Sequence, residues 1–379
     1  MKEFYEKIKV ELEVLTPVHI GSGERLSTYE YIYEEGRLKV YPFYYLLDRI
    51  TEEREDRRTN ILMKLRSGYT RLIDIFREFS LSYKPRYEIP YEGKPVSTYV
   101  EAFQKNMLGP YIPSSTIKGA IRTALISYML MEREELYRKV KQELYDMLGR
   151  KPTKEDLKRY AENHLEGLLR PRSMPKDAKY DLLKALLLPD IQLSFEDLYG
   201  VEMKMVSSER HIFPCEALKP GTRAEFDMLL TVKTFETAKK ITDTPPAQEK
   251  LRLKELKESV SGFYLQVIEQ EIEYFKKKGM HKTVEAFEGI KQKANEGMLL
   301  RIGKHQGYIS TTIMAVFRKK DRELFERVFE LSAPQVREEK PKTRRITFDG
   351  KPMGWILLKL LYNFLRVLAF GGFYAPMTS

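Results

Sequence analysis

The residues best suited to bind a ligand lie in residues 113–122, Pro-Ser-Ser-Thr-Ile-Lys-Gly-Ala-Ile-Arg. Ser115 and its two polar neighbours can cap a helix whose first free amide groups point toward an anion. Lys118 and Arg122 are four residues apart and share a helix face, while Gly119 lets a ligand backbone come close. The pattern predicts a phosphate site, and an ordinary capped helix with two surface cations is the alternative. The order Lys-Gly-Ala departs from a P-loop and disfavours nucleotide hydrolysis.

A second candidate loop lies within residues 300–312, where Gly303 and Gly307 bracket Lys304 and His305 after a strand-like pattern. Such a loop can present backbone amides and a cation to a phosphate group. Glycines are also common in tight turns that bind nothing, so a plain turn is the alternative.

The third candidate is the small-residue loop at residues 16–23, in which His19 precedes Gly21 and Gly23. His19 has three possible roles: general acid or base, ligand contact, or structural histidine. A ribonuclease would need a second base or a cation beside it, and the sequence offers no clear partner. We therefore predict no catalytic residue and expect these residues to contact a ligand.

The remaining histidines and the single cysteine argue against a metal or cofactor. His164, His211 and His281 are scattered without metal-ligand spacing, and no His-Glu-x-x-His motif occurs. Cys215 stands alone, which excludes an intrachain disulfide and a multi-cysteine zinc site. We expect no cofactor and no metal. A lone cysteine and the absence of a signal-peptide pattern lead us to expect a cytoplasmic protein.

Composition favours an anionic partner. The chain has 379 residues, a formal net charge of +11 and a pI near 9.2, with 42% hydrophobic and 32% charged residues. This length suits two packed cores, and the basic excess suits nucleic acid. The alternative is the Lys- and Glu-rich surface of a heat-adapted protein. Residues 355–370 are apolar but interrupted by Lys359, Asn363 and Arg366, so we predict an amphipathic helix there and no membrane span.

The hydrophobic pattern predicts an N-terminal domain over residues 1–232. Alternation indicates a strand at 8–15 and a hairpin at 29–41 around Glu35-Gly36. Helical pattern follows at 43–79, a loop with three prolines at 83–99, and an inserted helical segment at about 131–190. Strand pattern returns at 191–198, 211–217 and 224–232.

A second domain is predicted over residues 233–379. It contains a helical segment at about 246–295, strand pattern with the glycine loop at 298–317, a helix at 319–331, and a short strand at 345–348. Both halves mix helices with strands, so the fold class is α+β.

Taken together and in this order, residues 15–23, 111–122 and 301–307 resemble the RAMP proteins of type III-A CRISPR effector complexes. The strand and turn at 213–222 and the later Lys-Pro-Met-Gly-Trp at 351–355 add to the likeness. The resemblance implies two ferredoxin-like, RRM-related domains with helical insertions. Lys118, Gly119 and Arg122 match the family's Ser-x-Lys-Gly-x-x-Arg element, and Gly303 and Gly307 match its glycine-rich loop, here filled by Lys-His-Gln.

The resemblance further implies a non-catalytic RNA-binding subunit of a Csm effector complex. It would cap the complex at the 3′ portion of the CRISPR RNA and support RNA maturation and antiviral defence. The implied partners are CRISPR RNA, the repeated backbone subunit, the small subunit and host nucleases that trim the RNA, with no membrane. The alternative is an enzyme, a metal-independent CRISPR repeat endoribonuclease of the Cas6-like RAMP type that would use His19 or His305.

Overall fold

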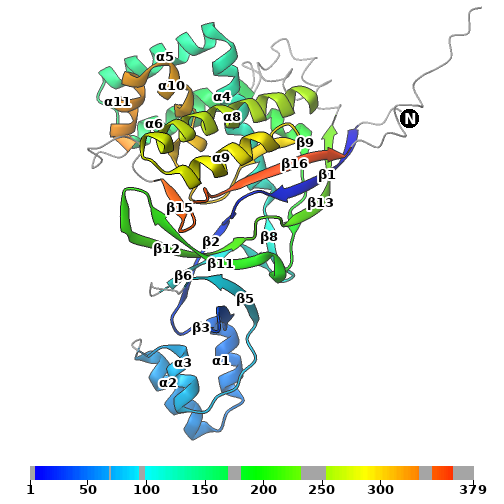
Figure 1. The fold of residues 1–379 in the computed structure, drawn as a ribbon, viewed down its shortest axis with the longest axis vertical. Helices are drawn as coiled ribbons and strands as arrows, with labels where there is room; N and C mark the ends of the chain where they lie inside the picture. Colours follow the sequence, from blue (N-terminus) through cyan, green and yellow to red (C-terminus); the bar gives the residue numbers. More distant parts are fainter. Residues whose placement is uncertain are drawn as a thin grey trace, which may run out of the picture.

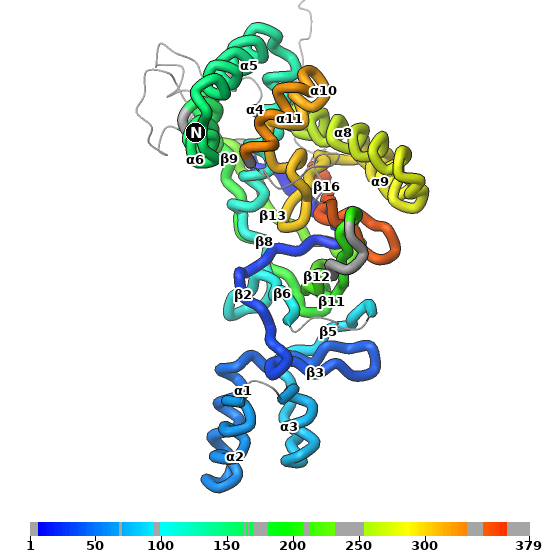
Figure 2. Tube along the Cα trace, turned by 90° about the vertical axis from the view of Figure 1, so that its left-hand side faces the viewer, coloured from blue at the N-terminus to red at the C-terminus, as the bar shows by residue number. Residues whose placement is uncertain are grey.

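A computed structural model describes residues 5–67, 70–93, 99–169, 181–231, 253–332 and 344–361. Helices gather at one end of the molecule, sheets lie in the middle, and a small helical lobe, residues 43–78, projects at the other end (Figures 1 and 2). The predicted α+β class is confirmed.

The strands are β1 (Tyr5–Val14), β2 (Gly21–Ser27), β3 (Tyr31–Glu34), β4 (Arg37–Val40), β5 (Tyr87–Glu92), β6 (Tyr99–Phe103), β7 (Lys105–Asn106), β8 (Gly109–Ile112), β9 (Leu186–Leu187), β10 (Ile191–Gln192), β11 (Leu198–Met205), β12 (Ser208–Leu218), β13 (Arg223–Thr231), β14 (Met298–Arg301), β15 (Arg345–Thr347) and β16 (Trp355–Leu361). The α-helices are α1 (Phe43–Thr51), α2 (Glu55–Arg66), α3 (Leu72–Glu78), α4 (Ser114–Glu132), α5 (Glu134–Gly149), α6 (Lys154–Tyr160), α8 (Leu253–Lys277), α9 (His281–Lys293), α10 (Met314–Lys320) and α11 (Arg322–Ser332). Shorter turns of 3-10 or π helix are η1 (Ala161–Leu165), η2 (Glu166–Leu169), η4 (Leu182–Ala185), η5 (Phe195–Asp197) and η7 (Tyr308–Ser310).

The first sheet has five strands in the order β14-β16-β1-β13-β9. Strand β1 forms as predicted, because its alternating residues Ile8, Val10, Leu12 and Val14 are buried. It pairs antiparallel with β13 on one side and β16 on the other. Strands from early and late in the chain therefore share one sheet. Residues 232–252 lie outside the described part, so the domain boundary at 232/233 stays a prediction.

Strand β16 corrects the helix predicted at 355–370. Trp355, Ile356, Leu357 and Leu358 are all buried, so both faces of the strand are covered. A strand buried on both faces has no polar alternation, and its apolar run resembles that of a helix. Residues 362–370 lie outside the described residues.

The second sheet has eight strands, ordered β2-β6-β12-β11-β5-β4-β3 with β15 paired to β11. The predicted hairpin is present as β3 and β4. Residues 83–99 were wrongly predicted as loop, because β5 forms there and pairs with β4 and β11 despite Pro90. The strand predicted at 191–198 is also wrong for the most part. Only Ile191–Gln192 is extended, and Ser194 caps a 3-10 turn that precedes β11.

The helices follow the predictions in most places. Helices α1 to α3 form a lobe with its own apolar cluster around Leu46, Ile50 and Ile61. Helices α5 and α6 lie within the predicted insertion, and α8 and α9 within the segment predicted at 246–295. The strand pattern at 298–317 holds only up to Arg301, because η7 and α10 occupy its second half.

Candidate nucleic-acid interface

Helix α4 carries the first candidate segment, but it does not begin as predicted. Ser115 and its neighbours do not cap the helix, since Pro113 is the N-cap residue and makes no side-chain cap. Instead, the Asp190 carboxylate oxygen Oδ1 accepts a hydrogen bond from the Ser114 N–H group, at 2.7 Å from the nitrogen. A negative side chain therefore already occupies the helix start, where free amides were expected to meet an anion.

The predicted residues of α4 share one outward side of the helix. Ile117 and Ile121 are buried in the core, while Ser115 and Gly119 are exposed and Lys118 is half-buried. A Cβ atom added at Gly119 would meet no other atom within 4 Å, so the space above this glycine is open. A ligand backbone can therefore approach the helix there.

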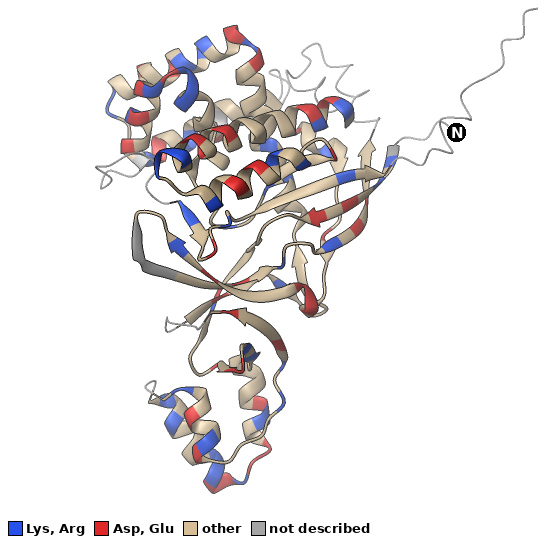
Figure 3. Ribbon diagram, viewed as in Figure 1, with Lys and Arg blue, Asp and Glu red and all other residues tan. Residues whose placement is uncertain are grey.

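The two cations of this side differ in their partners. The Arg122 guanidinium donates to Asp181 at 2.6 Å. Lys118 makes no ion pair within the described residues, and burial lowers the pKa of its ammonium group while Asp181 acts to raise it. Lysine and arginine are interspersed with acidic residues over the helices (Figure 3). Lys118 is thus the cation of α4 whose charge is least neutralised by a neighbour.

The glycine-rich loop after β14 lies beside α4. The Tyr264 hydroxyl of α8 is 3.3 Å from the carbonyl oxygens of both Ala120 and Arg301. The buried Arg301 guanidinium in turn donates to the Met353 carbonyl at 2.8 Å and to Ser310 Oγ at 2.9 Å. Burial lowers the pKa of Arg301 to about 10. These bonds fix the loop of residues 302–307 next to the helix.

The same loop packs against the third candidate, the loop at residues 16–23. The Lys304 N–H group donates to the His19 carbonyl at 2.7 Å. Gly303 has φ +83°, and a Cβ atom there would lie 2.4 Å from the His19 oxygen, so this position requires glycine. Gly23 and Gly307 also have positive φ but face open space. The structure thus brings all three predicted segments into one region.

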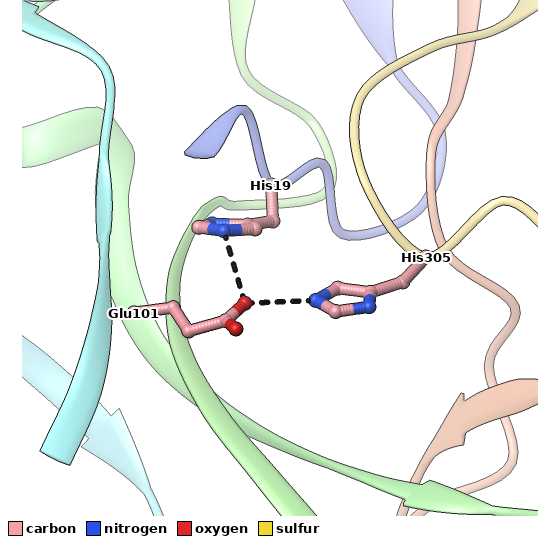
Figure 4. A group of neighbouring side chains, drawn as sticks. All are labelled: His19, Glu101 and His305. Carbon is pink, nitrogen blue, oxygen red and sulfur yellow. Dashed lines mark hydrogen bonds and ion pairs between the residues drawn. The ribbon is translucent and has the colours of Figure 1, made fainter. Parts of the chain in front are cut away.

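The predicted residues His19 and His305 both contact Glu101, a residue that the sequence analysis did not identify. His19, Glu101 and His305 form a buried cluster where the two sheets meet (Figure 4). His19 Nε2 and His305 Nε2 lie 3.5 Å and 3.2 Å from the same oxygen, Glu101 Oε2. Lys304 Nζ binds the other carboxylate oxygen at 2.7 Å. The only signal for Glu101 was an acidic residue within an apolar strand, β6.

Burial and hydrogen bonds set the charges in this cluster. Burial lowers the pKa of His19 to about 4, so its ring is neutral at pH 7. Burial alone would raise the pKa of Glu101, but hydrogen bonds from His305 and Lys304 lower it to about 2. Burial also lowers the pKa of His305, whose Nδ1 contacts Arg345. A neutral pair of histidines thus flanks one ionised carboxylate.

The structure leaves the predicted site residues in different surroundings. His19 has no exposed surface and His305 is 8% exposed, so neither presents its ring to a ligand outside. Their predicted contact with RNA stays a prediction, and their observed role is to join the two loops. Five of the predicted positions are exposed, namely Gly21, Gly23, Ser115, Gly119 and Lys304, whereas Gly303 and Gly307 are half-buried.

A protein with these two sheets and paired glycine loops falls in a known class. Residues 11–304 match the family model described as the RAMP superfamily, and the chain belongs to that family. In the described residues, no helix is long and apolar enough to cross a membrane.

One curated relative and two solved structures are similar to this chain. The chain is 30% identical over 142 residues to the CRISPR system Cms protein Csm5 of Streptococcus thermophilus, an alignment covering 34% of this chain and 40% of that protein. The crystal structure of T. onnurineus Csm5 is similar with a TM-score of 0.69 at 23% identity, covering 92% and 99% of the two chains. A chain of the cryo-EM structure of a type III-A Csm–crRNA–target RNA ternary complex gives 0.71 at 22% identity, covering 93% and 100%. These structures share the fold of this chain.

Proposed function

We propose that this protein is a non-catalytic RNA-binding subunit of a type III-A CRISPR effector complex, which caps the complex at the 3′ portion of the CRISPR RNA. Membership of the RAMP superfamily and the likeness to Csm5 support this assignment. The solved complex with a similar chain holds CRISPR RNA and target RNA, which makes RNA the first ligand to test.

The observation that carries the proposal is the position of α4 beside the glycine-rich loop. Lys118 offers a charge without an ion pair in the described residues, and Gly119 leaves open space next to it. The side chain of Lys304 is half exposed at the edge of the same region. Cations beside open backbone bind a sugar-phosphate chain without reading its bases.

Binding without cleavage is favoured over the endoribonuclease alternative. A metal-independent ribonuclease needs a histidine within hydrogen-bond reach of the RNA 2′-hydroxyl or its leaving oxygen. The side chains of His19 and His305 are 0% and 1% exposed, and the nearby Glu101 carboxylate repels phosphate. The two histidines are therefore better placed to hold the loops than to cut RNA.

The proposal is tested by incubating purified protein with end-labelled repeat RNA in the presence of EDTA. Native gels should show a retained complex, and denaturing gels should show intact RNA. His281→Ala, at an exposed histidine of α9, is the matched control for His19→Ala. Cleavage by the wild type that is lost in His19→Ala but kept in His281→Ala would establish the enzyme instead.

We propose the partners from the same resemblance: the repeated backbone subunit, the small subunit and, for RNA trimming, host nucleases, all in the cytoplasm. Purifying the protein from its native cells, sequencing the bound RNA and identifying the bound proteins tests these partners together. Recovery without CRISPR RNA would contradict the assignment.

A further inference from the structure

The buried cluster of His19, Glu101 and His305 contains a lone pair with no hydrogen-bond partner. His19 Nδ1 lies 2.6 Å from the backbone carbonyl of Glu216, which can only accept, so Nδ1 carries the proton of the neutral ring. The unprotonated Nε2 is fully buried, makes no hydrogen bond, and points at Glu101 Oε2 3.5 Å away. Two acceptors that face each other in a buried site call for a cation between them.

We propose that His19 Nε2, Glu101 Oε2 and His305 Nε2 bind a divalent transition-metal ion, preferably Zn²⁺. Zinc binds histidine nitrogen at about 2.0–2.1 Å and carboxylate oxygen at about 2.0–2.2 Å in a tetrahedron, which puts neighbouring ligand atoms about 3.3–3.5 Å apart. The oxygen lies 3.5 Å and 3.2 Å from the two nitrogens, and each of the three residues places a ligand atom within 4.8 Å of those of the other two. Two histidines and one carboxylate leave the fourth position for water.

Hydrogen bonds from outside the cluster orient two of its three side chains, as they do for the ligands of known metal sites. The Glu216 carbonyl holds the far nitrogen of His19, and Lys304 holds the far oxygen of Glu101, so each ligand is fixed from behind. His305 adopts φ +70°, which is unfavourable for a non-glycine residue. This conformation aims its ring at Glu101, and strained backbone is often kept where a side chain must be positioned.

Arg345 is the group that opposes metal binding. Its guanidinium contacts His305 Nδ1, which favours the tautomer with the proton on Nε2. Metal binding moves that proton to Nδ1, with no net proton released, and Arg345 must then leave the ring. The ring of Phe213, whose centroid is 4.1 Å from the Arg345 guanidinium carbon, already packs against this side chain and can keep contacting it when the bond to His305 is lost. Removing Arg345 should therefore tighten binding.

The bound ion would link three parts of the chain that are far apart in the sequence. His19 lies in the connection from the first sheet to the second, Glu101 lies in β6 of the second sheet, and His305 lies in the loop after β14 of the first. Sequence spacing could not indicate such a site, because its ligands come from positions 19, 101 and 305. The inference does not depend on the proposed RNA function.

The test uses full-length, tag-free protein freed of RNA, because nucleic acid itself carries divalent ions. After loading with ZnCl₂ and dialysis, elemental analysis should find about one zinc per chain, and Co²⁺ should give the visible absorption of a tetrahedral site. Zinc should also raise the melting temperature. His19→Gln, Glu101→Gln and His305→Gln should each weaken binding more than about 100-fold, a larger loss than changes outside the ligand set give. Arg345→Met should bind more tightly than the wild type.

His281→Gln is the matched control, since this histidine is exposed on α9 and should leave binding unchanged. Circular dichroism without metal identifies any variant that fails to fold, and the folded ligand variants decide the outcome. If none of the three ligand variants folds, the zinc affinity of Arg345→Met, measured by competition with a chelator, decides the outcome. Loss of zinc from the wild type on dialysis, unchanged binding in the folded ligand variants, or weaker binding in Arg345→Met would each overturn the proposal.

Discussion

Replacing Lys118 with alanine should weaken RNA binding by a salt-dependent amount. Each phosphate neutralised on single-stranded RNA contributes about 0.7 to the slope of log affinity against log salt concentration. Lys118 carries one charge with no ion pair in the described residues, so its loss should flatten the slope by about 0.7. Between 50 and 200 mM salt, the affinity of the wild type should then fall about 2.6-fold more than that of Lys118→Ala.

Arg122 should matter less, because Asp181 already neutralises part of its charge at 2.6 Å. The double variant Lys118→Ala with Arg122→Ala should therefore flatten the slope by about 0.7 to 1.4. Fluorescence anisotropy of labelled CRISPR RNA over a series of KCl concentrations measures this slope. Lys282→Ala removes the same charge from the exposed surface of α9 and is the matched control. Equal slopes for the wild type, Lys118→Ala and Lys282→Ala would refute the assignment of α4 as a phosphate contact.

Three further predictions concern stability and are measured by urea unfolding. Gly303→Ala should lower the free energy of unfolding by about 1–3 kcal/mol more than Gly307→Ala, because both put a side chain at φ +83° but only Gly303→Ala adds a clash with a backbone oxygen. Equal losses would contradict this. Arg344→Met should lower the free energy of unfolding by roughly 3–5 kcal/mol, because it leaves the buried Glu271 carboxylate of α8 without its ion-pair partner. A loss below about 1 kcal/mol would count against this. The hydrogen bond from Lys359 lowers the pKa of Glu13, so the ionised Glu13 stabilises the fold above the ordinary value of 4.5, and this stabilisation is lost as the pH falls below it. Glu13→Gln should therefore reduce the loss of stability in acid. An unchanged pH profile would contradict this.

The sequence predicted best those elements whose two faces differ. Strand β1 alternates between apolar and polar residues because one face meets the core. The hairpin of β3 and β4 was found from Glu35-Gly36, and both residues have the positive φ, 51° and 74°, that tight hairpin turns require. Helix α4 was found from the period of its buried face. In each case the pattern is local, so neighbours in the chain suffice.

Features that depend on distant parts of the chain were not predictable. Strand β16 lies inside the first sheet with both faces covered, which removes the alternation that would distinguish it from a helix. Asp190 reaches the start of α4 from a separate segment and replaces the expected cap. Glu101 joins His19 and His305 across the two sheets, and no spacing could indicate that. The three candidate loops were identified one by one, but only the fold shows that they meet.

Ultraviolet crosslinking of the assembled complex, purified from native cells, tests the central claim most directly. Mass spectrometry of the RNA-linked peptides should find the α4 peptide that contains Lys118 joined to the 3′ portion of the CRISPR RNA. A complex that holds CRISPR RNA but leaves this peptide unlinked, while other surfaces of the chain are linked, would contradict the account.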